Sequence, residues 1–509
     1  MATIASATII IVIGTICSNV FGVIKSVLVA KYFGIGAGLD AFYVSIILPM
    51  VLIGLVLGAM QSSIIPVFIE YKTKGKEEEG YRIFNSFFTL AIAIFLLLSL
   101  IMIFFSDFII SIVAPGFKDE RFSLASNLLK IVAPIVLLGG AADLIGSIFN
   151  ANKKFVVPAF GATVNVAVSL AYLILFKSQG VYALAIGLLL GSLAQCLYAI
   201  IGTINSGFKL GINFNFNSPG VKQIFGIMIP MFLGLTLSHA NITVDQVMAS
   251  LLTKGSIAAL NYANNINNIL SQLFIVSLGS AILPFLSQLV SEGRNEDLDR
   301  TFYTAIRMAA YILIPITVFI LILAAPAIKI FLERGEFDHN STLAVSGAWK
   351  AFSLGLFTFA TCVITSRVFV SYRRTKPLAF VTFMSVFINI AFNFILMRYL
   401  HHVGIALSTS ITGFLSAVLL IYLFNKKISK IKLAEIVFPV LRIIFYSLVA
   451  GSIMFFLSFW INIQNIHGIS IVFFAGLITY LLLSWIGNLD ELRILVGQRL
   501  SEKLIKTLP

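Results

Sequence analysis

The sequence is short of charged residues, which make up 11% of its 509 positions, whereas hydrophobic residues make up 59%. Soluble globular domains carry about 25% charged residues, so a soluble class is excluded and a polytopic membrane protein is predicted. A P-loop, a nucleophile motif and a metal-ligand spacing are missing, and no soluble segment is long enough for a catalytic domain. We therefore predict that the protein is not an enzyme.

Cysteine and acidic residues are also scarce. The three cysteines, Cys17, Cys196 and Cys362, lie in hydrophobic segments at unrelated spacings, so neither a disulfide framework nor a zinc site is expected. Lys and Arg outnumber Asp and Glu by 35 to 21, which gives a net charge of +14. The basic residues gather in short loops between hydrophobic segments, a pattern typical of membrane proteins and not of nucleic-acid-binding proteins.

Long apolar runs dominate the chain. A membrane-spanning helix needs about 20 mostly apolar residues, so the runs predict an all-α fold of about 14 transmembrane helices. The polar link 204–221 is rich in Asn and Gly and indicates a cytoplasmic linker between an N-lobe (1–203) and a C-lobe (222–424). A further helix pair (435–487) and a cytoplasmic tail (488–509) would follow. The fourteen predicted segments are 4–30, 38–69, 83–112, 124–149, 156–176, 180–203, 222–252, 256–290, 303–330, 342–372, 378–398, 402–424, 435–460 and 466–487.

Loop charges and an internal repeat predict the topology. Alternate loops hold 22 Lys and Arg on one side and 7 on the other, so we expect both termini in the cytoplasm. Short motifs recur about 220 residues apart, which indicates six helices followed by six in the same orientation. Parallel repeats of this kind are typical of transporters whose halves rock against each other. The recurring motifs centre on Pro66 and Pro284, Pro158 and Pro377, and Gly180 and Gly404.

Lys25 lies near the middle of the first segment, in a stretch that also contains Ser18 and Asn19. A lysine at such a depth costs roughly 2.5–3.5 kcal/mol on insertion scales and normally faces water or a partner. We interpret this stretch as one wall of an aqueous cavity for an anionic ligand. The alternative is that Lys25 extends to the membrane interface. Asp143 and Asp245 are also intramembrane charges, for which pairing or exposure to a cavity is expected.

Asparagines form a second polar feature. Asn261, Asn264, Asn265 and Asn268 share one helical face, because they recur at i, i+3, i+4 and i+7. They could join helices, since interhelical amide bonds add roughly 0.6 kcal/mol each, or they could line a cavity for a sugar or a peptide. Both alternatives stay open.

A candidate sodium site combines residues from three segments. Asn389 and Asn393 are spaced i, i+4, and Asp245 and Thr409 lie in two other segments. One carboxylate, two amide oxygens, a hydroxyl and a backbone carbonyl would suit a small hard cation.

Several motifs stand along the chain in order: VAKYFG (29–34), LDAFYV (39–44), APGF (114–117), NKKF (152–155), FLERGEF (331–337), YRRTKP (372–377) and HVGIALS (402–408). Together they resemble the MurJ/MviN family, the lipid II flippases of the MOP exporter superfamily. The resemblance runs from about residue 15 to about residue 430. It implies a two-lobed transporter that carries undecaprenyl-diphosphate-linked disaccharide-pentapeptide to the outer leaflet, with a groove near 435–487 for the lipid tail. It also implies a sodium site at Asp245, Asn389, Asn393, Ile405 (through its carbonyl) and Thr409.

The chain departs from the family where the resemblance implies cationic side chains. Asn19 and Lys25 stand where two arginines are usual, an arginine near Ile53 is missing, and amides replace the charged residues of segment 256–290. A lone lysine lacks the bidentate fork that arginine offers a phosphate. The predicted substrate-binding residues are Asn19, Lys25, Asp40, Asn264, Asn265 and Asn268.

The leading hypothesis is therefore a lipid II flippase of the bacterial cytoplasmic membrane that works by alternating access as a monomer. Its partners would be the lipid-linked substrate and membrane lipids, without nucleic acid, and its only cofactor would be a coupling sodium ion. Alternatives are a flippase for another polyprenyl-linked oligosaccharide, a cation-coupled multidrug exporter and a non-transporting membrane scaffold.

Overall fold

The computed structural model describes residues 4–208, 210–430 and 432–496, and this part consists of helices and their connections, without a strand. Helices satisfy every backbone N–H and C=O group internally, as a hydrocarbon environment requires. Among the described residues, twelve helices are long and apolar enough to cross a membrane. One of them, α15 (Lys376–Lys427), contains both predicted segments 378–398 and 402–424, with a non-helical residue, His401, between them. The all-α membrane fold is confirmed, and the count of fourteen stays a prediction.

The chain forms two compact units. The first comprises Met1–Ala258 with Arg334–Phe337, and the second comprises Ala259–Glu333 with Asp338–Pro509. The boundary falls one helix after the predicted linker 204–221, because α9 (Pro219–Ala249) packs along helices of the first unit.

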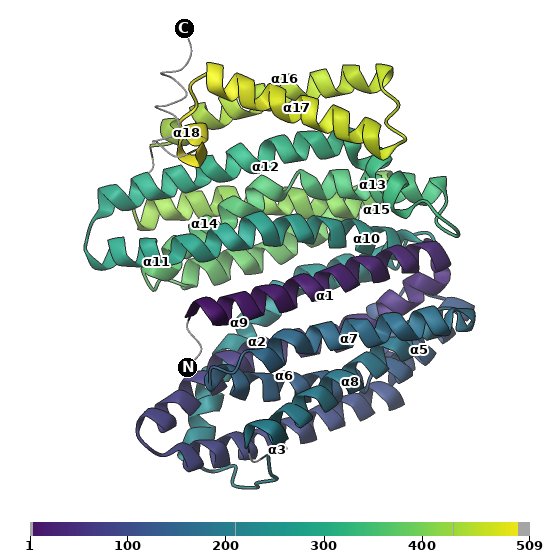
Figure 1. Ribbon diagram of the computed structural model, residues 1–509, viewed down its shortest axis with the longest axis vertical. Helices are drawn as coiled ribbons and strands as arrows, with labels where there is room; N and C mark the ends of the chain where they lie inside the picture. Colours follow the sequence, from purple (N-terminus) through teal and green to yellow (C-terminus); the bar gives the residue numbers. More distant parts are fainter. Residues whose placement is uncertain (1–3, 209, 431, 497–509) are drawn as a thin grey trace. The chain divides into compact units, whose positions relative to one another are not determined.

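The first unit is a bundle in which α7 lies between α1 and α8, while α6 packs against α2 and α8 (Figure 1). Small residues allow these close contacts. A side chain at Gly14 of α1 would lie 2.4 Å from the carbonyl oxygen of Ala159 on α7. The elements of this unit are α1 (Ile4–Phe33), α2 (Ala37–Thr73), α3 (Glu77–Phe104), α4 (Ser106–Val113), α5 (Asp119–Val132), α6 (Ile135–Ala151), α7 (Val156–Leu175), η1 (Lys177–Gln179), α8 (Tyr182–Ser206) and α9.

The second unit is organised around α12, which packs against α13, α14 and α16. The predicted helix pair 435–487 corresponds to α16 and α17. The predicted tail 488–509 contains the helix α18, and its residues 497–509 lie outside the described residues. The other elements are α10 (Ser256–Leu270), the π-helical turn η2 (Ser271–Val276), α11 (Ser277–Ser291), α12 (Asn295–Leu332), α13 (His339–Ser353), α14 (Leu356–Ser371), α15, α16 (Ala434–Trp460), α17 (Ile466–Ile486) and α18 (Asp490–Val496).

The backbone supports the predicted internal repeat. Segment 124–149 is divided into α5 and α6, and segment 342–372 is divided in the same way into α13 and α14. After each pair, an equivalent basic residue adopts a left-handed conformation, Lys153 with φ 58° and Arg373 with φ 56°. Both residues belong to motifs that recur about 220 positions apart, so the repeat in the sequence is also a repeat in the structure.

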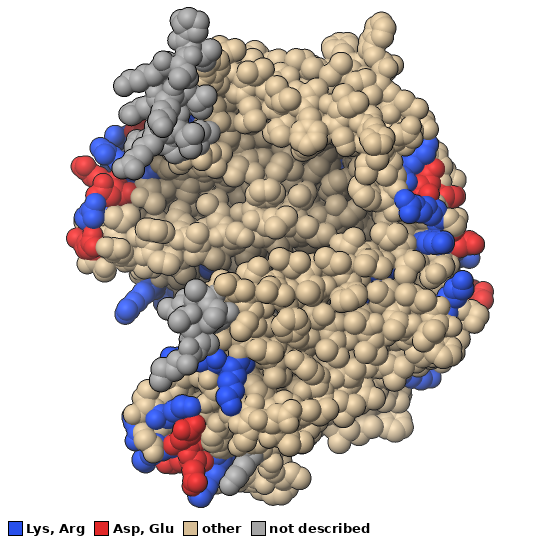
Figure 2. Space-filling view, viewed as in Figure 1, with Lys and Arg blue, Asp and Glu red and all other residues tan. Residues whose placement is uncertain are grey.

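Charged side chains gather near the helix ends on the face shown in Figure 2, and uncharged residues cover the middle of the helices. This distribution fits a multi-pass membrane protein, because charges are costly inside hydrocarbon.

A short return segment, Arg334–Phe337, closes the end of α1. The Glu336 N–H donates to the carbonyl oxygen of Lys31 at 3.0 Å. Gly335 has a φ of +62°, and a Cβ there would lie 2.3 Å from the same oxygen. Both its conformation and the close backbone contact therefore require glycine at position 335.

Gly335→Ala is expected to destabilise the protein by more than the roughly 1–2 kcal/mol that a left-handed conformation costs alone. Gly293 provides the matched control, since its φ is +70° and nothing lies within 4 Å of its Cβ position. Thermal unfolding of both variants in detergent measures the difference. Equal losses of stability for Gly335→Ala and Gly293→Ala would mean that the contact with α1 contributes nothing to the stability of the fold.

Candidate functional site

A polar cavity of about 370 Å³ lies inside the first unit, between α1, α2, α6, α7 and α8. Of the predicted substrate-binding residues, Asn19 lines this cavity. Gln61, Asn150 and Gln195 also line it and were not predicted from the sequence. Their signal was weak, since single amides in apolar helices do not reveal which helix faces meet. The polar lining residues are Thr15, Ser18, Asn19, Gln61, Asp143, Asn150 and Gln195.

Asp143 of α6 contributes a carboxylate to this cavity. Nε2 of Gln195 donates to Asp143 Oδ1 at 3.3 Å, and Oε1 of Gln195 accepts from Asn165 Nδ2 at 2.9 Å. Among the described residues, no Lys or Arg pairs with Asp143. An amide pair from α7 and α8 thus holds the carboxylate in place without neutralising it.

Lys25 lies on α1, six residues beyond Asn19, and is not part of the cavity lining. It is half-buried and makes no hydrogen bond or ion pair with any described residue. It precedes the end of α1 by eight residues, or about 12 Å at 1.5 Å per residue. An ammonium group at such a depth without an acidic partner is available to an anionic ligand.

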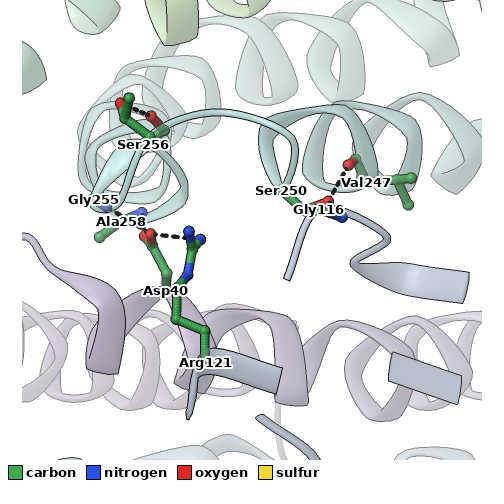
Figure 3. Close-up of polar contacts among 9 residues, drawn as sticks. Asp40, Gly116, Arg121, Val247, Ser250, Gly255, Ser256 and Ala258 are labelled. Atoms are coloured by element: carbon green, nitrogen blue, oxygen red, sulfur yellow. Dashed lines mark hydrogen bonds and ion pairs between the residues drawn. The ribbon is translucent and has the colours of Figure 1, made fainter. Parts of the chain in front are cut away.

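The Asp40 carboxylate lies against the backbone at the start of α10 (Figure 3). The carboxylate is fully buried, and it accepts hydrogen bonds from the backbone N–H groups of Gly255 at 2.6 Å and Ala258 at 2.8 Å. The guanidinium of Arg121 lies 3.4 Å from the same carboxylate. Because α10 begins at Ser256, Asp40 caps the N-terminus of that helix, where a negative charge is stabilising. These contacts give Asp40 a structural role, and its predicted contact with a substrate stays a prediction.

The asparagines of the predicted segment 256–290 lie on α10 in the second unit. Asn265 and Asn268 are exposed and Asn264 is half-buried, and none of the three forms a hydrogen bond with a described residue. Of the two alternatives that the sequence left open, this geometry favours exposure to a ligand over bonds between helices. The π-helical turn η2 follows directly, and such turns are frequent at functional sites.

The predicted sodium ligands fall into both units. Asp245 lies on α9, which belongs to the first unit, while the other four belong to α15 in the second. Asn389 and Asn393 are fully buried, and Asn393 Nδ2 donates to Asn389 Oδ1 at 3.1 Å. Ser408 Oγ donates to the Asn389 carbonyl oxygen at 3.1 Å, which joins the two halves of α15. The Ile405 carbonyl oxygen accepts from Thr409 Oγ1 at 3.1 Å.

A second, largely apolar cavity of about 550 Å³ lies within the second unit, between α11 and α12. Arg300, near the start of α12, belongs to its lining and is exposed. The cavity therefore combines an apolar groove with one cationic side chain. Its apolar lining includes Phe274, Leu278, Ile282, Met308, Ile312 and Leu495.

Comparisons with known proteins agree with this architecture. A family model described as "Lipid II flippase MurJ" matches residues 29–474. A "Probable lipid II flippase MurJ" from Vibrio cholerae serotype O1 is 30% identical over 420 residues, which cover 80% of each chain. One from Buchnera aphidicola subsp. Acyrthosiphon pisum is 28% identical over 460 residues, covering 89% of this chain and 90% of the relative.

Solved structures are similar as well. One described as "Lipid II flippase MurJ, inward closed conformation" matches with a TM-score of 0.82 and 27% identity, covering 95% of this chain and 99% of that chain. An inward-facing multidrug resistance MATE family transporter of the MOP superfamily matches with a TM-score of 0.68 and 15% identity, covering 81% and 94%. The second likeness concerns the fold alone.

Proposed function

The chain belongs to the MurJ family of lipid II flippases, and we propose that it moves this lipid-linked peptidoglycan precursor from the inner to the outer leaflet of the bacterial cytoplasmic membrane. The observation that carries the proposal is the family match, which spans residues 29–474 and so covers most of both repeats. The excess of Lys and Arg in alternate loops supports a cytoplasmic location for both termini. The transporter would act as a monomer by alternating access.

The diphosphate of the substrate would be held by Lys25. Support comes from its position inside α1 without an acidic partner among the described residues. A cation in low-dielectric surroundings attracts a diphosphate far more strongly than it would in water. Asn19 on the same helix would bind the sugars or the peptide.

The polyprenyl tail would enter the apolar cavity between α11 and α12. Its lining suits a hydrocarbon chain, and Arg300 offers a positive charge at the end where the predicted cytoplasmic loops lie. The predicted groove near 435–487 is compatible with this placement, because α16 and α17 both pack on α12.

Sodium would be the coupling ion. The buried amides Asn389 and Asn393, the Ile405 carbonyl and the Thr409 hydroxyl supply oxygen atoms of the kind that sodium prefers. The ion would supply only a positive charge, and the oxygen atoms of these residues would coordinate it.

Sodium dependence gives a direct test. We expect transport to fall when sodium is replaced by choline, and Asn389→Ala to raise the half-maximal sodium concentration by at least about tenfold. Ser385→Ala is the control, because this buried serine lies one turn earlier on α15 and is outside the proposed set. Equal transport in sodium and choline would remove sodium from the mechanism.

The proposed function itself is tested by genetic replacement. A bacterium depleted of its sole lipid II flippase should grow when this chain is expressed. Membrane insertion without rescue would favour a second candidate, a flippase for another polyprenyl-linked oligosaccharide. That candidate is supported by the amides at Asn264, Asn265 and Asn268, where the family resemblance implies charged residues.

A further inference from the structure

The polar cavity of the first unit contains a single ionisable side chain, Asp143. The cavity is bordered by the first residues of α7 and by α6 residues from Ala142 to Asn150, next to the basic loop at Lys153. Asp143 precedes the end of α6 by eight residues, or about 12 Å along the helix. The carboxylate therefore lies in the half of the unit whose loops carry most of the positive charge.

The two oxygens of Asp143 have different surroundings. Oδ1 accepts the Gln195 amide N–H, and the Gln195 oxygen is in turn occupied by Asn165, so Gln195 presents its N–H groups to the carboxylate. Oδ2 has no hydrogen-bond partner among the described residues. Asp143 is only half-buried, so this oxygen remains open to a ligand from the cavity.

No other titratable group competes for a ligand at Asp143 within the described part of the chain. The helices that line the cavity or pack against α6 carry further titratable or charged side chains, but none of these belongs to the lining and none pairs with Asp143. They are Cys17, Lys25, Lys31 and Tyr32 on α1, Asp40, Tyr43, Glu70, Tyr71 and Lys72 on α2, Glu77, Glu78, Glu79, Tyr81 and Arg82 on α3, Tyr172 on α7, and Tyr182, Cys196 and Tyr198 on α8.

The geometry favours a proton over a metal cation as the ligand. A sodium ion needs several oxygen ligands close together, whereas Gln195 turns its N–H groups, not its oxygen, toward Asp143. The cavity of about 370 Å³ is also large for an ion cage. It has room for several waters at roughly 30 Å³ each, and its amides and hydroxyls can hydrogen-bond to them.

We propose that Asp143 is a proton-binding site of the first unit, supplied by water in this cavity. A hydronium ion that reaches the cavity transfers its proton to Oδ2 and leaves as a neutral water, which converts the carboxylate into a neutral carboxylic acid. Transfer of the proton back to a water molecule regenerates hydronium and the carboxylate. The proton-binding site is inferred from geometry alone, and its role in transport rests on the proposed function.

Protonation of Asp143 would affect the helix that carries the substrate residues. Ser18 and Asn19 of α1 line the same cavity, and the Gly14 carbonyl oxygen of α1 accepts from Thr163 Oγ1 at 3.1 Å. Removing the negative charge changes the electrostatic field that these polar groups experience. The proton site would thereby couple the position of α1 to pH.

Infrared difference spectroscopy on the purified full-length protein tests the site. Between alkaline and acidic buffer, the wild type should gain a carboxylic acid band that is lost in Asp143→Asn. Asp245→Asn is the matched control, since it removes the other intramembrane carboxylate and should leave this band in place. Asp143→Glu should retain a titrating band at a shifted position, which covers the case in which Asp143→Asn does not fold.

Three outcomes would overturn the proposal. The pH-dependent band could persist in Asp143→Asn, it could be lost in Asp245→Asn, or no carboxylic acid band could appear in the wild type between alkaline and acidic buffer. The spectrum is recorded without substrate and is therefore independent of transport. A band that depends on Asp143 in a protein unable to move lipid II would refute the proposed function and support the proton site.

Discussion

Asp40→Asn is expected to prevent accumulation of the folded protein, with a loss of about 3–5 kcal/mol in stability. The wild-type carboxylate accepts two backbone N–H groups and faces Arg121, all at a fully buried position. An asparagine would turn its own N–H₂ toward one of these donors and leave Arg121 without its counter-charge. The N-terminus of α10 would also lose its cap, because Gly255 and Ala258 provide the bonded N–H groups.

Fluorescence-detected size exclusion after heating measures this effect in crude detergent extracts. Glu120→Gln is the matched control, since Glu120 is an exposed acid next to Arg121 and forms no ion pair with a described residue. It should behave as the wild type. If Asp40→Asn were as stable as Glu120→Gln and lost only transport, Asp40 would belong to the substrate site after all.

Lys25→Ala is expected to abolish rescue of cells depleted of their own lipid II flippase. A hydrogen bond to a charged group contributes about 1.5–3 kcal/mol, so removal of the ammonium should weaken diphosphate binding by roughly 10- to 100-fold. The effect should be large here, because the other cationic positions that the family resemblance implies are occupied by uncharged residues. Stability should change little, since Lys25 has no partner among the described residues.

Two further variants identify the charge as the cause. Lys25→Arg keeps the positive charge and should retain rescue, because a guanidinium can also bind a phosphate. Lys31→Ala removes an exposed lysine at the end of the same helix and should be silent. Full rescue by well-expressed Lys25→Ala would exclude Lys25 as the diphosphate anchor.

The membrane helices could be predicted because each satisfies a local condition, a long apolar run. The repeat was visible for a similar reason, since Lys153 and Arg373 lie in short motifs whose backbone conformation recurs. The breaks between α5 and α6 and between α13 and α14 were not predicted, because apolar residues continue through both positions.

The candidate site could be predicted only in part. Lys25 and Asn19 stand out because a polar residue in an apolar run is a local signal. The cavity around Asp143 depends on which faces of five helices meet, and a single sequence does not contain that information. Asp40 was placed among the substrate residues because its partners are backbone N–H groups more than 200 residues away, which have no side-chain signature.

The central claim is that this chain moves lipid II across a membrane, and translocation by the purified protein in liposomes measures this most directly. Lipid II is placed in the inner leaflet, and its arrival outside is measured with an enzyme that modifies only the exposed headgroup. The account predicts time-dependent exposure with the wild type and exposure at the protein-free rate with Lys25→Ala. Exposure at the protein-free rate with correctly folded wild-type protein, under both sodium and acidic conditions, would contradict it.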